Sequence, residues 1–127
     1  MKQTLRLLCV LAAATMATGC VIHVGADDDD RSYIHDDGIK AKEARNRDII
    51  SGLALGISAE AVRDRLGEPD FSEAWMEDGH EVRVLRYRTH RTHSDGDTTR
   101  DETTPLVFRD GKLEGIGERA EQGARGQ

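Results

Sequence analysis

The chain has 127 residues, of which 33% are charged and 4% aromatic, so it holds enough apolar material for one small core. Its net charge of −6 at pH 7 argues against nucleic acid as the main partner, because binding to phosphates needs a basic surface. Length, composition and charge together indicate one small acidic domain.

The first 19 residues predict an export signal. Lys2 and Arg6 are followed by an apolar run, residues 7–17, that carries no charge, which is the order of a secretory signal. The run is shorter than the roughly 20 apolar residues that a transmembrane helix needs. Removal of residues 1–19 would leave 16 basic and 24 acidic side chains, a net charge of −8.

The end of this signal, Ala17-Thr18-Gly19-Cys20, resembles the lipobox of bacterial lipoproteins, although Ala17 stands where that motif usually has leucine. The resemblance implies that Cys20 becomes the first residue, an S-diacylglycerol cysteine that is also N-acylated. More than one acyl chain is what stable membrane anchoring requires. An ordinary signal peptide, with a free thiol left at Cys20, is the alternative.

Cysteine content and the next residue extend this interpretation. Cys9 lies in the segment that would be removed, so Cys20 would be the one cysteine of the mature chain and could form no internal disulfide. In the best-known sorting systems an aspartate after the lipidated cysteine retains the protein at the inner membrane. Val21 stands there, which implies a lipid anchor in the outer membrane with the domain facing the periplasm.

Residues 20–38 predict an acidic flexible tether. The segment contains the run Asp27–Asp30 and shows no hydrophobic periodicity. It could span roughly 65 Å when extended. A calcium loop is less favoured, because the alternating ligand spacing and the central glycine of such a loop are absent.

The folded domain is expected over residues 39–118 and to begin with two helices. Residues 40–51 are good helix formers, with Gly52 as a stop. The second helix is predicted from a Ser58 N-cap to the left-handed C-cap position at Gly67.

Short strands are expected after the second helix. Asp78-Gly79 and Asp110-Gly111 are typical of hairpin turns, and residues 91–104 form a polar connection with Asp95-Gly96 at its tip. The predicted strands are residues 71–76, 81–89, 106–109 and 112–117. The alternation slips between Val84 and Leu85, which indicates either a bulge or a strand covered on both faces.

These elements predict an α+β fold, with two N-terminal helices packed on one face of a three- to four-stranded antiparallel sheet. Trp75, Phe71 and Tyr87 are expected to join one core. Residues 119–127 are small and polar, and we expect them to be a disordered tail.

The segments "SGLALGIS" and "AEAVRDRLGEP", followed by a strand-rich half, resemble the SmpA/OmlA family. That superfamily includes the small lipoprotein of the outer-membrane β-barrel assembly machinery, and its fold is related to that of β-lactamase inhibitor protein repeats. The stretches "LGEPDFSEAW", "VLRYRTHRT" and "DGDTTRDETTPLVFRDGKLEGIGE" resemble more closely a family of Gram-negative lipoproteins whose function is not established. The closer resemblance covers residues 45–118 and implies a fold, but no catalytic residue and no cofactor.

A search of the residues for chemistry gives one cluster. His90, His93, Asp95 and Asp97 could approach a divalent metal around the predicted hairpin, since histidine with carboxylate is a zinc-binding set. Two histidines an odd number of residues apart would point to opposite faces of a regular strand, so a solvated hairpin tip is favoured.

A local stripe of arginines, at positions 83, 86, 88 and 91, is interpreted as the solvated face of a strand beside acids. It contains one aromatic residue, Tyr87, and so lacks the interleaved stacking side chains of a nucleic-acid surface.

Two functions from different classes follow. The first is a non-catalytic envelope lipoprotein that binds another envelope protein in outer-membrane assembly or maintenance, as the resemblance implies. The second is a periplasmic metal-binding or hydrolytic protein that uses the hairpin of residues 90–97. The first is favoured because it needs no active site, and we expect the chain not to be an enzyme.

Overall fold

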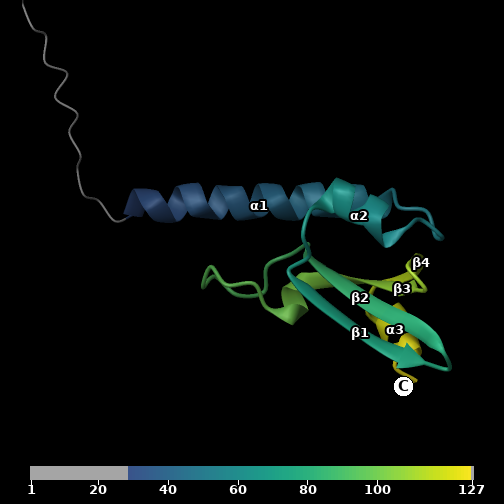
Figure 1. Ribbon diagram of the computed structural model, residues 1–127. Helices are drawn as coiled ribbons and strands as arrows, with labels where there is room; N and C mark the ends of the chain where they lie inside the picture. Colours follow the sequence, from purple (N-terminus) through teal and green to yellow (C-terminus); the bar gives the residue numbers. More distant parts are fainter. Residues whose placement is uncertain (1–28, 127) are drawn as a thin grey trace, which may run out of the picture.

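Three helices and a four-stranded antiparallel sheet make up the structure, a computed structural model that describes residues 29–126, with side chains from residue 36 onward. The predicted α+β class is confirmed. The strands lie in the order β1-β2-β3-β4. In chain order the elements are α1 (Asp29–Ser51), α2 (Ala59–Leu66), β1 (Phe71–Glu77), β2 (His80–Arg88), the 3-10 helix η1 (Arg100–Glu102), β3 (Thr103–Arg109), β4 (Lys112–Ile116) and α3 (Glu118–Ala124) (Figure 1).

Helix α1 begins at Asp29, inside the segment predicted as a tether. Lys40 Nζ lies 2.7 Å from Asp36 Oδ2, and Arg91 from the loop after β2 also pairs with Asp36. The prediction of a flexible tether is therefore wrong for residues 29–38, which are helical, and Asp36 in this segment has two cationic partners. No helix within residues 29–126 is both long and apolar enough to cross a bilayer.

Other predictions fall on residues that the structure does not describe. The signal of residues 1–19, the lipidation site at Cys20 and the first part of the tether, residues 20–28, lie outside the described part of the chain.

Helix α2 has the caps that the sequence predicts. The Ser58 hydroxyl accepts a hydrogen bond from the Ala61 backbone N–H at 3.2 Å. Gly67 follows the last helical residue as predicted, with φ +80° and ψ −160°, a positive-φ conformation that glycine adopts without steric cost but that lies outside the left-handed helical region. Helix α1 likewise ends at Ser51, immediately before Gly52.

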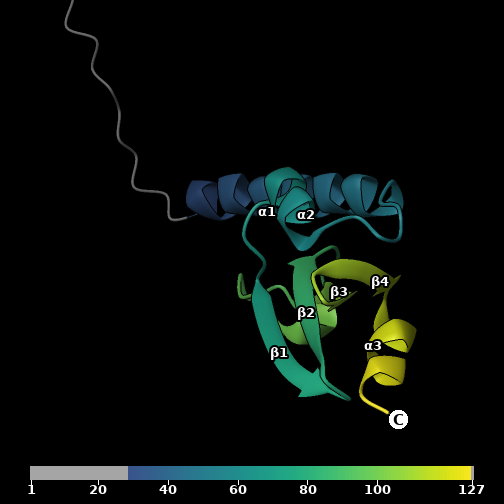
Figure 2. The ribbon, with the colours of Figure 1, turned by 45° about the vertical axis from the view of Figure 1, so that its right-hand side comes forward.

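Helices pack on both faces of the sheet (Figure 2). Helices α1 and α2 cover one face, and α3 covers the other, where it packs against β3 and β4. Strand β2 pairs with both of its neighbours without a register shift, so the slip between Val84 and Leu85 reflects two covered faces rather than a bulge. The one core contains Ile50, Val62, Leu66, Leu85, Tyr87, Leu106, Phe108 and Leu113, and the other contains Val82, Val84, Val107 and Ala124.

Two predictions about this packing are wrong. Trp75 and Tyr87 do not share a core, because Trp75 packs half-buried on the α3 side and Tyr87 is buried under α1 and α2. Residues 118–124 form helix α3 instead of belonging to a disordered tail, so helices lie on both sheet faces.

Helix α3 lies very close to the sheet. A Cβ atom added at Gly115 of β4 would lie 2.6 Å from the Ala120 Cβ atom, so glycine allows this approach. The helix offers the core little more than Ala120 and Ala124, which is too weak a hydrophobic pattern to predict a helix. Its acidic side chains supply the rest of its contacts with the sheet, as described below.

Candidate functional site

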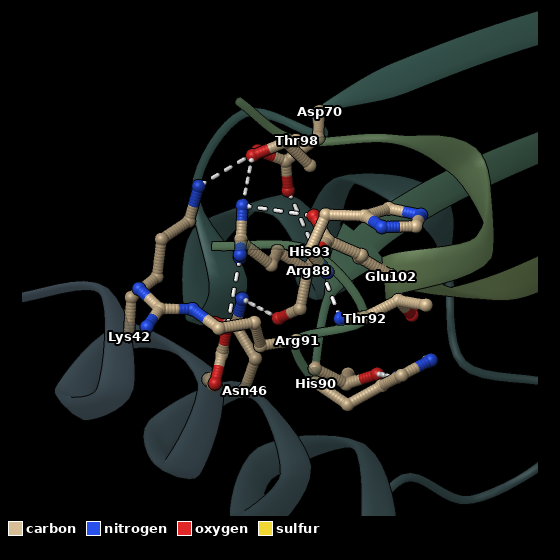
Figure 3. A network of polar contacts seen from close by, with 12 residues as sticks. Lys42, Asn46, Asp70, Arg88, His90, Arg91, Thr92, His93, Thr98 and Glu102 are labelled. Carbon is tan, nitrogen blue, oxygen red and sulfur yellow. Dashed lines mark hydrogen bonds and ion pairs between the residues drawn. The ribbon is translucent and has the colours of Figure 1, made fainter. Parts of the chain in front are cut away.

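The hairpin predicted as a metal site is a loop that leaves β2 and returns through η1. In it, His90 Nδ1 lies 3.0 Å from the Thr89 hydroxyl, and His93 Nε2 lies 3.6 Å from Asp101 Oδ2. Asp95 Oδ1 instead accepts a hydrogen bond from the Asp97 backbone N–H at 3.1 Å. No three His, Cys, Asp or Glu side chains within the described residues are placed to hold a metal ion. The two imidazoles lie apart in Figure 3, so the structure does not assemble this candidate set.

Arg88, the last residue of β2, lies at the centre of a buried polar network (Figure 3). Its side chain is 2% exposed. Arg88 Nε donates to Glu43 Oε1 of α1 at 2.9 Å, and Nη1 lies 3.1 Å from Glu102 Oε2 of η1. The same Nη1 donates to the Asp97 carbonyl at 2.7 Å and to the Thr98 hydroxyl at 2.9 Å. Arg88 therefore joins α1, β2 and the loop through one guanidinium.

The backbone of Arg88 is held as well. Its N–H donates to Asp70 Oδ2 at 2.8 Å, and its carbonyl accepts from Asn46 Nδ2 at 2.8 Å. Asn46 is fully buried. Its hydrogen bond to the backbone of β2 therefore holds α1 against the end of that strand. We call Arg88, Glu43, Glu102, Asn46 and Asp70 the Arg88 network.

Glu102 closes the loop. Its carboxylate accepts hydrogen bonds from the backbone N–H groups of Thr92 at 2.8 Å, His93 at 2.9 Å and Thr99 at 3.3 Å. The hydrogen bond from His93 is the largest cause that lowers the pKa of Glu102, from 4.5 to about 2, and the Arg88 charge adds to it against the effect of burial. Glu102 is fully buried, so it stays ionised inside the protein and ties both ends of the loop to β2.

Arg86 centres a second network on the α3 side. Its guanidinium donates to both carboxylate oxygens of Glu118, at 3.1 and 3.2 Å, and pairs with Glu121. Glu121 also accepts from Arg125 Nη2 at 2.8 Å. Glu73 of β1 completes the set by pairing with Arg125 and Arg100. We call these six residues the Arg86 network.

The prediction that Arg86 and Arg88 lie on a solvated face is wrong, although both do face acids. Arg86 is 6% exposed and Arg88 1% exposed. Each is buried because several carboxylates and carbonyls replace the water that a guanidinium would lose, which is the condition for burying a charge. Both networks join secondary structure elements.

A hollow of about 540 Å³ lies between η1, β3 and the start of α3, and Arg86, Arg100 and Thr104 help to line it. Both arginines already bind carboxylates of the protein. An anionic ligand would therefore have to displace those carboxylates, and the hollow is a poor anion site.

The two edges of the sheet differ. Residues 56–59, which lead into α2 and include its first residue, cover the edge at β4. Gly56 N–H donates to the Leu113 carbonyl at 2.8 Å, Leu113 N–H to the Ile57 carbonyl at 2.9 Å, and Ala59 N–H to the Gly111 carbonyl at 2.9 Å. Strand β1 pairs with β2 alone, and Figure 2 shows it at the outer side of the sheet. Within residues 29–126, β1 is the long open edge.

The side chains of β1 alternate between two environments. On the α3 side, Trp75 is half-buried with the Arg125 guanidinium 4.7 Å from its ring centre, and Glu73 and Glu77 pair with arginines. On the opposite side Ser72, Ala74 and Met76 are exposed, Met76 at 67%. The charges of β1 are thus neutralised, and an apolar side chain stands uncovered beside its open edge. The sequence pattern alone does not identify which strand forms the open edge.

Comparisons with known proteins identify a family and no individual relative. No curated protein and no solved structure matched the chain. A family model with the description "Protein of unknown function (DUF3192)" matches residues 18–123, a span that includes Cys20 and almost the whole described fold. Since the match covers most of the chain, this protein belongs to the DUF3192 family of proteins of unknown function.

Proposed function

We propose that this chain is a non-catalytic envelope lipoprotein whose α+β domain binds proteins through the open edge of β1. The carrying observation is that edge, seven residues long, paired on one side and bordered by the exposed Met76 side chain. An open strand edge offers a row of backbone donors and acceptors to another extended chain.

Rigid support for this edge favours recognition. The Arg86 network holds Glu73 of β1 to α3 and η1. The Arg88 network fixes the neighbouring strand β2 to α1. A preformed strand loses little conformational entropy on binding, and this saving improves affinity.

The proposed anchor is Cys20, acylated on sulfur and nitrogen in the outer membrane with the domain in the periplasm. The support is the order of the charged, apolar and small residues before Cys20 and the Val21 that follows it. Outer-membrane assembly or maintenance is the proposed setting, because two helices before an antiparallel sheet is the arrangement that the SmpA/OmlA resemblance implies.

The anchor is tested by labelling cells with radioactive palmitate. The wild-type chain should incorporate the label and sediment with membranes, and Cys20→Ser should lose the label and leave the membrane fraction or remain unprocessed. A Cys20→Ser chain of mature size that stays membrane-bound would contradict lipid anchoring.

Protein binding is tested by placing a photocrosslinking amino acid at Met76 and, as a control, at the exposed Glu60 of α2. Illumination of intact cells should give defined protein adducts from position 76 and none from position 60, and mass spectrometry identifies the captured protein. The absence of any adduct from position 76 would contradict binding at β1.

A further inference from the structure

We infer that the open edge of β1 pairs with β1 of a second copy of this chain, antiparallel, about a two-fold axis at Ala74. This inference rests on the proposed function, since it names the partner of the same edge. The argument uses the strand's register, its charges and the exposure of its side chains.

Symmetry restricts the registers that such a pair can adopt. A two-fold axis that relates antiparallel neighbours within one sheet stands perpendicular to the sheet. Residues opposite one another therefore lie on the same face, and their numbers add to an even sum, since successive side chains alternate between faces. The axis must then pass beside a residue rather than between two.

Charge selects among these registers. With the axis at Glu73, that carboxylate would face its own copy, and with the axis at Trp75, Glu73 would face Glu77. Like charges directly opposite each other destabilise a strand pair. With the axis at Ala74, Glu73 faces Trp75 and Glu77 faces Phe71. This register also pairs all seven residues of the strand.

The same register suits the exposed face of β1. Ala74 faces Ala74 at the axis, and Ser72 faces Met76 on either side of it. Small residues at the centre let the two backbones approach without a steric conflict. The uncovered Met76 side chain, 67% exposed in one copy, would gain a neighbour from the other.

The devices that usually prevent edge pairing are weak here. Natural edges are protected by charged side chains, above all lysine, by proline or by bulges. Strand β1 contains no proline and no lysine, and its register with β2 is unbroken. Its two charges are neutralised, Glu73 by Arg100 and Arg125 and Glu77 by Arg109. Each carboxylate of the edge is therefore already paired within its own chain, and the remaining electrostatic penalty falls on registers that set two carboxylates directly opposite each other.

Two short strands make a small interface, and interfaces below about 1,200 Å² are typical of weak complexes. Lipid anchors would confine the copies to one membrane surface, and such confinement raises effective concentration. The pairing is therefore best tested in membranes, where it is expected to be strongest.

Cysteine crosslinking of the full chain in cells tests the register. In the proposed pair the Ala74 Cα atoms lie about 4.5–5.5 Å apart, a separation that a disulfide spans. Ala74→Cys should give a disulfide-linked dimer of twice the monomer mass under mild oxidation. The parent chain, with its own cysteines, and Glu60→Cys on α2 are the controls, and both should remain monomeric.

A pair of cysteine variants tests which residues of the two β1 strands lie opposite each other. Ser72 and its own copy would lie about 13 Å apart, four residues along the strand, so Ser72→Cys alone should not crosslink, and neither should Met76→Cys. Cells that express both variants should give the mixed dimer. Ala74→Glu, added to both the Ser72→Cys and the Met76→Cys chain, places two carboxylates face to face and should reduce the yield of the mixed dimer at least tenfold. Ala44→Glu on the exposed side of α1, added in the same way, should leave that yield unchanged.

Two outcomes would overturn the inference. Ala74→Cys could give no more dimer than Glu60→Cys, or Ser72→Cys could crosslink to itself as efficiently as to Met76→Cys. If self-pairing fails while the photocrosslinker at Met76 captures a different protein, the proposed function stands with another occupant of the edge. Failure of both experiments would remove the proposed binding site itself.

Discussion

Arg86 and Arg88 lie two residues apart on β2, yet they are buried in different ways. Both partners of Arg88 are themselves buried, with Glu43 8% exposed and Glu102 fully covered at the side chain. Of the partners of Arg86, Glu121 is 6% exposed but Glu118 is 59% exposed, and Glu121 keeps a second cation, Arg125. The Arg88 side chain and both of its carboxylate partners are thus shielded from water, whereas the Arg86 network opens to water at Glu118.

This difference teaches which arginine the fold depends on. A buried carboxylate that loses its one cationic partner remains as an uncompensated charge, while an exposed carboxylate is solvated by water. The Arg88 network also joins segments far apart in the sequence, α1 and the loop before β3. Its loss should therefore affect the whole domain, and loss of Arg86 should affect α3 first.

The largest effect is expected for Arg88→Met, which keeps much of the side-chain volume but removes the charge. We expect a loss of about 3–5 kcal/mol in the free energy of unfolding, the range for breaking a buried ion pair on one side. Urea denaturation followed by circular dichroism measures it. Arg83→Met is the matched control, because Arg83 lies on the same strand with a 31% exposed side chain and a 43% exposed partner, Glu81. Equal losses in the free energy of unfolding for Arg88→Met and Arg83→Met would contradict the conclusion that the fold depends on the buried Arg88.

Glu102→Gln should have the next largest effect, about 1.5–3 kcal/mol at pH 7, the range for hydrogen bonds to a charged group. Arg88 keeps Glu43 in this variant, so the cost should be below that of Arg88→Met. The loop of residues 90–101 should also exchange its amide hydrogens faster, because the amides of Thr92, His93 and Thr99 lose a charged acceptor.

The difference in stability between the wild type and Glu102→Gln should depend on pH, because the pKa of Glu102 is lowered in the folded protein. Its folded pKa, about 2, lies below the ordinary value of 4.5. The stability contributed by its ionised form is thus fully present above about pH 4.5 and is lost as the pH falls through 2. The gap between wild type and Glu102→Gln should narrow steadily from pH 5 to pH 2 in urea denaturation. A gap that stays constant over this range would show that the Glu102 charge is not the stabilising feature.

Arg86→Met should cost less, about 1–2 kcal/mol, as for a buried polar group that keeps part of its hydrogen bonding. Glu121 retains Arg125, and Glu118 turns to solvent. Hydrogen exchange should report early opening of α3, with β2 and β3 still protected. Loss of protection in all three elements together would mean that the two networks are not independent.

The parts of the fold that sequence predicts are those set by neighbouring residues. The Asp-Gly turns are one case: Asp78 and Gly79 have φ values of +50° and +82°, and Asp110 and Gly111 have +48° and +77°, as a type I′ hairpin turn requires. The caps of α2 are another, because an N-cap serine needs a donor three residues ahead and nothing else.

The parts that sequence does not predict depend on distant residues. Arg88 is buried by Glu43, 45 residues earlier, and Arg86 by Glu121, 35 residues later. No local pattern separates such an arginine from a solvated one. The open edge is a similar case, because β1 is distinguished from β4 by the cover that residues 56–59 give to β4.

The smallest effect is expected for Glu118→Gln, at the rim of the Arg86 network. Its side chain is 59% exposed, and exposed ion pairs contribute about 0–1 kcal/mol. Glu121→Gln is the matched comparison on the same helix, one turn further, with a side chain 6% exposed between Arg86 and Arg125. Glu121→Gln should lower the free energy of unfolding, measured by urea denaturation, clearly more than Glu118→Gln does, because Arg86 and Arg125 lose the carboxylate that they share. If Glu118→Gln proved as unstable as Glu121→Gln, the exposed rim of the Arg86 network would be held as tightly as its buried side. The contrast between Arg86 and Arg88 would then come from their positions on β2 rather than from access to water.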